Sequence, residues 1–406
     1  MPWRRVVITG LGVISALGRN AAEFWSSLSR GIPGIRPMEI VDRTQFRFQN
    51  GAEVPGYRTE DYFDPEKATL LDRFSEFGLI AAHEALRASG IQWTPELLAR
   101  TAIVTGTAVG GQTAEDHAFA DLYQRGRTRF HPLSIPRIMA NALASHISME
   151  TGITGPVFTI STACSSANHA IGHAFWMVRS GLADAAIAGG SEAPFSPGNL
   201  RAWEAMRVVS SDTCRPFSKN RSGMILGEGG GILVLECIDL ALSRGATIYG
   251  EIVGFGMSSD AHHITQPAAS GAARAMVLSL EDAELHPDAI GYINAHGTGT
   301  PANDAMEIAA IRQVFGNHAA RLAISSTKSL HGHALGAAGA LEGIATVLGL
   351  QNGVLPPTAN YTEPDPECDL DVIPNQAREV ACEFALSNSF AFGGLNAVVA
   401  FRNPGL

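Results

Sequence analysis

One cysteine in this chain stands where a buried strand is expected to turn into a helix. The apolar residues 157–160 predict the strand, and apolar positions from Ala167 to Val178 recur at the spacing of an amphipathic helix. A thiol at the N-terminal end of a helix feels the positive end of the helix dipole, which favours the thiolate. Cys164 is therefore a candidate nucleophile, although an inert buried cysteine would suit the same position.

Two histidines occupy the same kind of position further along the chain. His296 follows the apolar run 290–293, and His333 lies between a strand-like segment at 322–325 and a helical pattern around Leu341. A helix N-terminus disfavours a protonated imidazole, so we expect neutral histidines that can donate an N–H group. Because strand ends that open onto helices collect the active sites of α/β folds, these residues predict one catalytic site.

The motifs around these residues resemble those of β-ketoacyl-acyl carrier protein synthases, in the same order and at similar spacings. They are Thr-Ala-Cys-Ser-Ser at 162–166, His-Gly-Thr-Gly-Thr at 296–300, Lys328, Gly-His at 332–333 and Asn-Ser-Phe-Ala-Phe-Gly-Gly at 388–394. The resemblance covers essentially the whole chain and is strongest to the elongating type II branch, which has a Cys-His-His site. Residues 358–372 are similar to the nodulation protein E subgroup.

The resemblance implies an α/β protein with a thiolase-like five-layer αβαβα fold, built from two duplicated βαβαβαββ halves. The chain itself shows a coarse repeat of strand, reactive residue and helix, which favours largely parallel central strands. We place the boundary near Ala246, so that residues 1–246 carry the nucleophile and residues 247–406 carry the histidines and Lys328. The family is usually a homodimer, and a heterodimer is the alternative.

The resemblance also implies a reaction. Cys164 would take an acyl group from an acyl carrier protein, with the backbone N–H groups of Cys164 and Phe392 as the oxyanion hole. Malonyl-acyl carrier protein would lose carbon dioxide, and His296 and His333 would stabilise the resulting enolate. Its attack on the acyl-cysteine would give a 3-oxoacyl-acyl carrier protein. The implied enzyme is a 3-oxoacyl-[acyl-carrier-protein] synthase, an acyltransferase that needs no metal, nucleotide or organic cofactor.

Lys328 matches a family site position and would act beside the histidines, with Glu307 as its expected partner. A structural role for Glu307 is also open, because residues 304–307 have the form of a capping box that would begin a helix over residues 305–315. The two roles are compatible, and we expect the carboxylate to face the site.

Other residues are expected to shape the substrate channel. Phe392 would gate acyl entry, and Val109 matches a position that sets pocket depth in the family. The family more often has glycine at position 391, threonine at 395 and an aromatic residue at 224. These departures favour an acyl chain outside housekeeping fatty acid synthesis, such as an unsaturated or polyene chain. The predicted substrate-binding residues are Val109, Met224, Thr298, Thr300, Ala391, Gly393 and Asn396.

Composition and charge narrow the class of protein. In 406 residues, 46% are hydrophobic and 17% are charged, which describes a heavily buried protein, and no apolar stretch is long enough to span a membrane. The formal charge of −10 argues against nucleic acid as a general partner. The chain starts without a signal-peptide core, and its five cysteines form no close CxxC pair, so we expect a reducing cytoplasm.

An acidic enzyme that receives an acidic carrier protein needs a local basic patch. The candidate docking residues are Lys67, Arg127, Arg129 and Arg207. Ordinary solvated surface charge explains any single one of them equally well.

Three alternatives to a condensing enzyme are open on sequence alone. A non-catalytic chain-length-factor-like partner subunit of a ketosynthase heterodimer would share the fold, but it normally lacks the nucleophile that Cys164 supplies. A degradative thiolase would need a second catalytic cysteine, and neither Cys368 nor Cys382 lies in a suitable glycine turn. A metallohydrolase is opposed by the lack of ligand spacing around the histidines, and we interpret His331 as pocket wall or surface.

Overall fold

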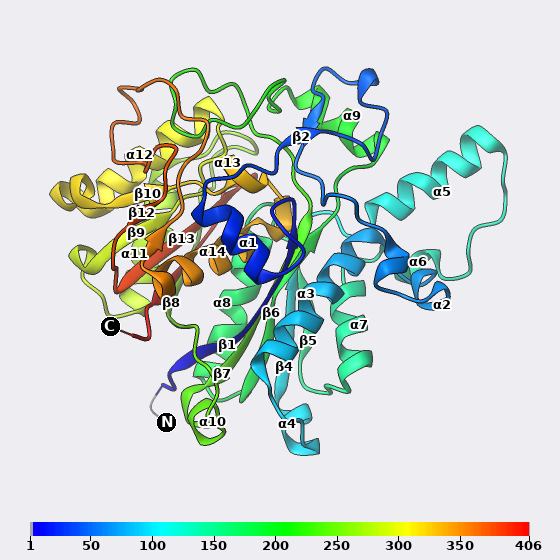
Figure 1. Ribbon diagram of the computed structural model, residues 1–406, viewed down its shortest axis with the longest axis horizontal. Coiled ribbons are helices and arrows are strands. Elements are labelled where there is room, and N and C mark those ends of the chain that lie inside the picture. The colour runs from blue at the N-terminus through cyan, green and yellow to red at the C-terminus, as the bar shows by residue number, and fades with distance from the viewer. Residues whose placement is uncertain (1–2, 406) are drawn as a thin grey trace.

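A computed structural model describes residues 3–405 of the chain (Figure 1). The N-terminal part contributes five long strands to the central sheet. In sheet order they are β5 (Val157–Ile160), β4 (Thr101–Gly106), β6 (Ala185–Glu192), β7 (Gly229–Cys237) and β1 (Val6–Ser15). β4 is parallel to β5 and to β6, whereas β7 is antiparallel to β6 and to β1.

The C-terminal part repeats this arrangement. In sheet order its strands are β10 (Ala323–Ser325), β9 (Ile290–Asn294), β13 (Phe384–Ala391), β14 (Leu395–Arg402) and β8 (Gly250–Ser259). β9 is parallel to β10 and β13, and β14 is antiparallel to β13 and β8. Numbered along the chain, both halves have the order 3-2-4-5-1, so the duplicated α/β architecture is confirmed.

Pairing of β1 with β8 joins the two five-stranded sheets into one sheet of ten strands. The strand pattern restarts at β8, after α10 (Ile238–Ser243). This restart supports the division that we propose near Ala246. Two small hairpins lie outside the main sheet, β2 (Arg36–Pro37) with β3 (Asn50–Gly51) and β11 (Val354–Leu355) with β12 (Arg378–Glu379).

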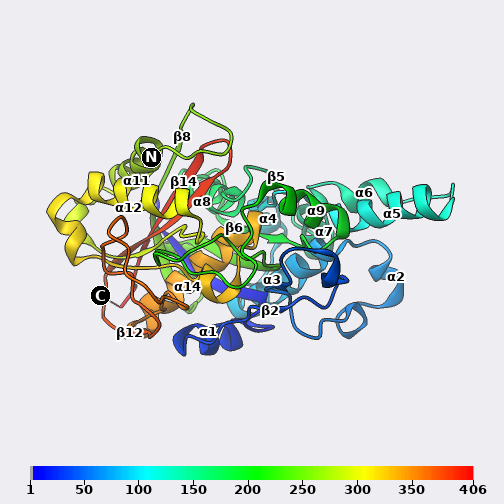
Figure 2. The same cartoon turned by 90° about the horizontal axis from the view of Figure 1, so that it is seen from above.

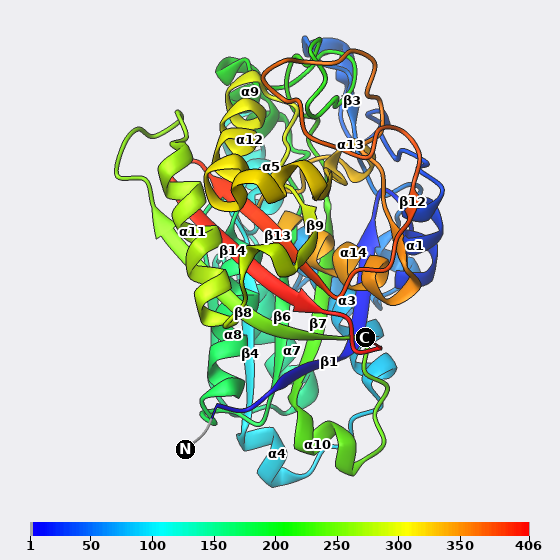
Figure 3. The ribbon, with the colours of Figure 1, turned by 90° about the vertical axis from the view of Figure 1, so that its left-hand side faces the viewer.

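Helices form three layers around the two sheets. α3 (Arg73–Ser89) and α7 (Ala142–Thr151) cover the outer face of the N-terminal sheet, and α11 (Ala269–Asp282) and α12 (Pro301–Phe315) cover that of the C-terminal sheet (Figure 3). α8 (Ser166–Arg179) and α14 (Ala338–Asn352) contact strands of both halves and each other. The remaining α-helices are α1 (Ala21–Ser29), α2 (Pro65–Ala68), α4 (Pro95–Ala99), α5 (Gln112–Arg125), α6 (Ser134–Ile138), α9 (Pro197–Met206) and α13 (Lys328–His331).

The two central helices are built for burial on all sides. Every residue of α14 from Ala338 to Leu350 is buried, as expected for a helix that is apolar around its whole circumference. Small residues let α8 and α14 approach their neighbours closely. A Cβ atom at Gly339 would lie 2.5 Å from Asn168 on α8, and one at Gly172 would lie 2.3 Å from Phe255 on β8. This packing fixes the N-terminal ends of both helices at the site described below.

Helices α5 and α6 stand apart from this core. They project from the body of the molecule, and α5 has no buried residue (Figure 2). None of the helices in residues 3–405 has the length and apolar character needed to cross a membrane.

Candidate active site

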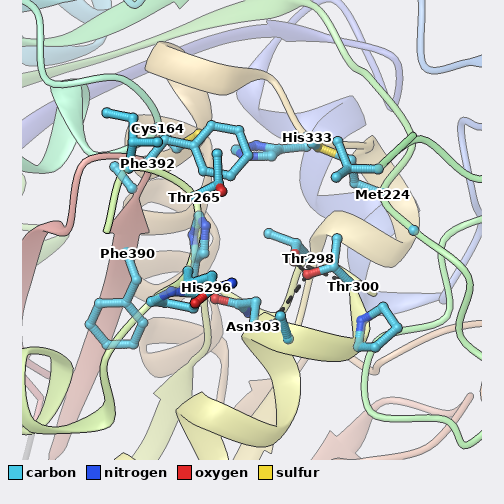
Figure 4. A pocket seen from close by; sticks show the side chains of 18 of the residues that line it. Cys164, Met224, Thr265, His296, Thr298, Thr300, Asn303, His333, Phe390 and Phe392 are labelled. Atoms are coloured by element: carbon cyan, nitrogen blue, oxygen red, sulfur yellow. Dashed lines mark hydrogen bonds between the residues drawn. The ribbon is translucent and has the colours of Figure 1, made fainter. Parts of the chain in front are cut away.

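A cavity of about 250 Å³ lies among the segments that follow β5, β9 and β13. Figure 4 shows the side chains of Cys164, His296 and His333 gathered around it. These residues come from both halves of the chain, and the structure brings together the three that the sequence predicts as one catalytic site. Other predicted residues in its lining are Met224, Thr298, Thr300, Ala391 and Phe392.

Cys164 sits in a sharp turn between β5 and α8. Ala163 has a φ of 50°, which is uncommon for a residue with a side chain. The Ser166 hydroxyl holds the turn, because it accepts a hydrogen bond from Thr162 N at 2.9 Å and donates one to Ala163 O at 2.7 Å. This clamp presents the sulfur at the N-terminal end of α8, in the cavity wall.

The protonation state of Cys164 differs from the expected thiolate. Burial, with smaller contributions from Glu192 and Glu342, raises the pKa of its thiol to about 12. Lys328 and a backbone hydrogen bond from Phe392 act in the opposite direction, but burial outweighs them. The resting thiol is therefore protonated at neutral pH. The bond from Phe392 also shows that its N–H group reaches the sulfur, where an oxyanion donor is required.

His296 and His333 are both buried and stand almost perpendicular to each other. Their ring centroids are 5.4 Å apart, with an angle of 84° between the planes. Burial and the nearby charge of Lys328 lower the pKa of both imidazoles well below 6.5. The Nδ1 atoms of both rings have no hydrogen-bond partner among residues 3–405. The site thus holds two neutral imidazoles.

Backbone contacts fix the two histidine segments. Glu307 on α12 accepts hydrogen bonds from His296 N at 2.9 Å and Gly297 N at 2.8 Å, and from the Asn388 side chain at 3.1 Å. His333 forms a β-bridge, in which its N–H donates to Ile225 O at 2.7 Å and its carbonyl oxygen accepts from Gly227 N at 2.9 Å. Each ring is therefore held through its own main chain.

The structure corrects two expectations about Glu307. Its carboxylate binds backbone amides of the His296 loop, and Lys328 pairs instead with Glu342 on α14, where both side chains are fully buried. α12 begins at Pro301 rather than at residue 305, with Thr300 as its N-cap. Proline suits the first helical turn because it has no N–H to satisfy, so the Thr-Pro pair sets the start that the capping-box pattern misplaced.

Burial also shifts the pKa of Glu342, the partner of Lys328. Burial raises the pKa of Glu342 to about 7, while the charge of Lys328 and its hydrogen bond oppose the rise. Glu342 was missed in the sequence because it lies on the next helix, with no motif spacing to connect it to Lys328. The pair places one fixed positive charge beside Cys164 and both histidines.

The predicted substrate-binding residues fall into two groups. Met224, Ala391, Thr298 and Thr300 line the cavity, and the hydroxyls of the two threonines are 2.8 Å apart (Figure 4). The remaining three do not line it. Gly393 donates its N–H to Ile264 O at 2.8 Å, Asn396 donates to Asp260 Oδ1 at 2.7 Å beneath the Gly393–Gly394 turn, and Val109 is 38% exposed outside the cavity.

Val109 lies outside because its loop turns the main chain inward. Its N–H and that of Ala108 point to Glu192, a fully buried carboxylate at the end of β6. His331 is likewise neither pocket wall nor surface. It is fully buried, with Nδ1 2.8 Å from Gly332 O and Nε2 3.0 Å from Thr327 Oγ1, because α13 packs into the core. Burial lowers the pKa of His331 to about 3.

The sequence analysis missed two residues, one that contacts Phe392 and one that lines the cavity. Trp203 on α9 stacks on Phe392, with ring centroids 6.2 Å apart and 25° between the planes. Asn303 on α12 lines the cavity beside Thr300. No motif marks Trp203, and only the approach of α9 to the β13–β14 turn reveals it. Asn303 could have been found from its place in the first turn after the His-Gly-Thr-Gly-Thr motif.

The four predicted docking residues lie on three different segments of the chain, with Arg127 and Arg129 both between α5 and α6. Lys67 of α2 pairs with Glu150 at 2.6 Å, and Arg127 pairs with Asp121 at 3.1 Å. Arg129 is exposed on the segment between α5 and α6, and Arg207 follows α9 at the mouth of the cavity. Arg207 is therefore the one of the four that a ligand entering the cavity would meet.

Comparison with known proteins agrees with this geometry. The family model of the beta-ketoacyl synthase N-terminal domain matches residues 3–240, and that of the C-terminal domain matches residues 249–362. Nodulation protein E of Rhizobium leguminosarum bv. trifolii is 47% identical over 400 residues, covering 98% of this chain and 99% of that protein. The 3-oxoacyl-[acyl-carrier-protein] synthase 2 of Synechocystis sp. is 40% identical over 407 residues, covering 98% of each.

Solved structures give the same result. The ishigamide ketosynthase/chain length factor superposes with a TM-score of 0.94 at 37% identity and covers 99% of both chains. A beta-ketoacyl synthase from Burkholderia phymatum superposes with a TM-score of 0.91 at 36% identity, covering 98% of this chain and 99% of that one. The duplicated fold, with a thiol and two imidazoles around one cavity, defines a condensing enzyme of the thiolase-like class.

The chain belongs to the β-ketoacyl synthase family, in the elongating branch that includes nodulation protein E and 3-oxoacyl-[acyl-carrier-protein] synthase 2. It is an acyltransferase that makes a 3-oxoacyl thioester by condensing an acyl thioester with a malonyl thioester.

Proposed function

We propose that Cys164 carries the growing acyl chain and that His296 and His333 direct the decarboxylation of malonyl-acyl carrier protein. The product is a 3-oxoacyl-acyl carrier protein. The observation that carries this division of roles is the meeting of one buried thiol and two neutral imidazoles around a single cavity.

The first step is acyl transfer. The Cys164 sulfur attacks the thioester carbon of an acyl carrier protein, a carbon–sulfur bond forms, and the carrier leaves as a thiol. Because the resting thiol is protonated, its proton passes during the attack to the sulfur of the leaving carrier, which therefore departs as a thiol. The backbone N–H groups of Cys164 and Phe392 stabilise the tetrahedral oxyanion.

The second step breaks the bond between the malonyl carboxylate and its neighbouring carbon. Carbon dioxide leaves, and the electron pair becomes an enolate whose oxygen needs hydrogen-bond donors. His296 and His333 supply one N–H each, and Lys328 keeps both rings neutral by its positive charge. Neutral donors stabilise the enolate without protonating its carbon.

The third step joins the two groups. The enolate carbon attacks the carbonyl carbon of acyl-Cys164, and the same oxyanion donors serve a second time. Collapse of the tetrahedral intermediate expels the Cys164 sulfur, which regains a proton, and releases the 3-oxoacyl thioester.

We also propose the setting in which the enzyme works. Arg207 at the cavity mouth and Arg129 on the projecting segment are the first candidates to meet an acidic carrier protein, with Lys67 and Arg127 already paired to carboxylates.

The chain acts as a dimer in the cytoplasm, with a second copy or with a chain-length-factor partner. One similar solved structure is titled as a ketosynthase in complex with its chain length factor.

The channel is proposed to favour an acyl chain outside housekeeping synthesis. Ala391 and Met224 line the cavity at positions where the family more often has glycine and an aromatic residue. A flexible thioether wall adapts to an irregular or unsaturated chain better than an aromatic ring does. Equal elongation of ordinary saturated chains and unsaturated chains by the purified enzyme would contradict this preference.

Intact-mass spectrometry tests the proposed function. Wild-type enzyme and a Cys164→Ala variant are each incubated with a panel of acyl-carrier proteins of different chain length and unsaturation. An acyl adduct on the wild type alone supports Cys164 as the carrier residue, and the chain that loads fastest names the substrate class. An adduct on the variant, or none on either protein, contradicts the proposal.

A further inference from the structure

Glu192 is a buried carboxylate that the reaction described above does not use. It ends β6, is fully buried and does not line the cavity. Four donors converge on its two oxygens. They are Thr107 Oγ1 at 2.8 Å, Ala108 N at 2.7 Å, Val109 N at 3.4 Å and Gly336 N at 2.9 Å.

These donors belong to two segments, one that contacts the Cys164 turn and one that carries His333. Thr107 follows β4, and its carbonyl oxygen accepts a hydrogen bond of 3.3 Å from Ser166, the residue whose hydroxyl clamps the Cys164 turn. Gly336 lies in the 3-10 turn η5 (Leu335–Ala337), three residues after His333 in the chain. Glu192 therefore links the nucleophile turn to the histidine segment.

The approach between the two segments is close. A Cβ atom at Gly336 would lie 2.2 Å from Ala108 N and 2.6 Å from Glu192 Oε2. Backbone N–H groups from both segments point at the same oxygen, so the segments meet only because an acceptor stands between them. A carboxylate offers two acceptor oxygens and no donor, whereas an amide would turn an NH₂ group toward N–H donors.

Burying such a carboxylate opposes folding, because an apolar interior disfavours the charged form. Burial raises the pKa of Glu192 to about 7, and its charge raises the pKa of the Cys164 thiol. The carboxylate thus works against thiolate formation at the nucleophile. The reactivity of Cys164 would be better served by a neutral residue, so it does not account for an acid here.

We propose that Glu192 is a positioning residue that fixes His333 relative to Cys164, so that the enolate forms within reach of the acyl-cysteine. This inference rests on the proposed function. Acylation needs only the Cys164 turn and its oxyanion donors. Condensation also needs His333 at the correct distance and orientation relative to Cys164. Loss of the Glu192 contacts should therefore slow condensation and leave acylation nearly unchanged.

The test measures both half-reactions at pH 8 in Glu192→Gln. Acylation is followed by intact mass, and condensation by release of the 3-oxoacyl product from preloaded enzyme given malonyl-acyl carrier protein. We expect condensation to fall about 10- to 100-fold while acylation stays within about threefold of wild type, because a displacement on the order of 1 Å has this effect on a reaction between positioned groups. Alkylation of Cys164 by iodoacetamide should not slow, since a repelling charge is removed.

Three further variants keep the result interpretable. Glu236→Gln changes an equally buried glutamate on β7 that binds Thr9 and Arg244, and it should leave the ratio of the two rates unchanged. Thr107→Val removes one donor and should lower condensation selectively, whereas Thr107→Ser should restore it. The two Thr107 variants decide the matter if Glu192→Gln does not fold.

An unchanged ratio in Glu192→Gln and in Thr107→Val would overturn the inference, as would a parallel loss of both half-reactions. Failure of the wild type to form an acyl adduct is a different result, because it would overturn the proposed function instead.

Discussion

The two halves of the molecule share one topology and carry different chemistry. In each half the third strand leads into a central helix, which is α8 after β5 and α14 after β10. The first of these connections carries Cys164, and the second carries Lys328 and His333. The two equivalent strand ends thus meet at one cavity, where in the proposed mechanism one half makes the covalent bond and the other sets the charge.

The equivalence extends to a second pair of strand ends. The loop after β9 carries His296 and is held by backbone hydrogen bonds to Glu307, whereas the loop after β4 carries Val109 and is held by backbone hydrogen bonds to Glu192. In both halves a buried carboxylate lies under the loop, and the loop carries an imidazole that lines the cavity in one half and a partly exposed valine in the other. A shared scaffold therefore does not dictate a shared function at equivalent positions.

The largest effect should come from removing Cys164, the residue that the N-terminal half contributes to the proposed reaction. Cys164→Ala should lower the overall condensation rate by at least about 10³-fold, because no other group in the cavity can hold the acyl chain. Release of carbon dioxide from malonyl-acyl carrier protein should persist in this variant. Carbon dioxide release and product formation, measured together, check this prediction, and equal loss of both would show that the halves are not separable.

Removing the imidazoles should give the converse result. His296→Ala or His333→Ala should lower decarboxylation by about 10² to 10³-fold, the range found when one preorganised donor to an oxyanion is lost. Because the pKa of both rings lies well below 6.5, both stay neutral from pH 6 to pH 8, and the wild-type rate of carbon dioxide release should show no histidine titration near pH 6.5. A rate that rises with a midpoint near pH 6.5 would indicate a titrating histidine and contradict neutral donors.

Breaking the buried Lys328–Glu342 ion pair should lower the stability of the protein without changing its fold. Lys328→Ala leaves Glu342 buried without its partner, so we expect the free energy of unfolding to fall by about 3–5 kcal/mol. Lys328→Met combined with Glu342→Leu removes both charges and should restore much of it. Urea denaturation of the single and double variants measures the difference, and a double variant no more stable than Lys328→Ala would contradict the explanation.

The smallest effect concerns the gate. Trp203→Phe keeps a ring against Phe392 and should change the acylation rate by less than about threefold, in line with the energy of one aromatic contact. Wild-type tryptophan fluorescence should change when an acyl group enters and moves Phe392, and this change should be lost in the variant. A fluorescence change that persists in Trp203→Phe would place the motion elsewhere.

Much of the site could be predicted because its signals are local. A cysteine or histidine at the junction of an apolar strand and a glycine-rich turn is visible within about ten residues of sequence, and Cys164, His296 and His333 were all found in this way. The architecture followed from the repeated strand and helix pattern together with the family motifs.

What escaped prediction depends on contacts between distant segments. Lys328 was expected to pair with Glu307, but the approach of α13 to α14 selects Glu342. The thiolate expected from the helix N-terminus is suppressed because burial raises the pKa of Cys164, and burial is a property of the whole fold. His331 was expected at the pocket wall or on the surface, but the packing of α13 buries it.

The most direct test of the division of labour between the halves is a single-turnover experiment on a His296→Ala/His333→Ala double variant. The enzyme is mixed with acyl-carrier protein and malonyl-acyl carrier protein, and intact mass and carbon dioxide are followed together. We predict that the acyl adduct accumulates on Cys164 while carbon dioxide release stays at background. Carbon dioxide release at the wild-type rate, or absence of the adduct from a folded variant, would contradict the account.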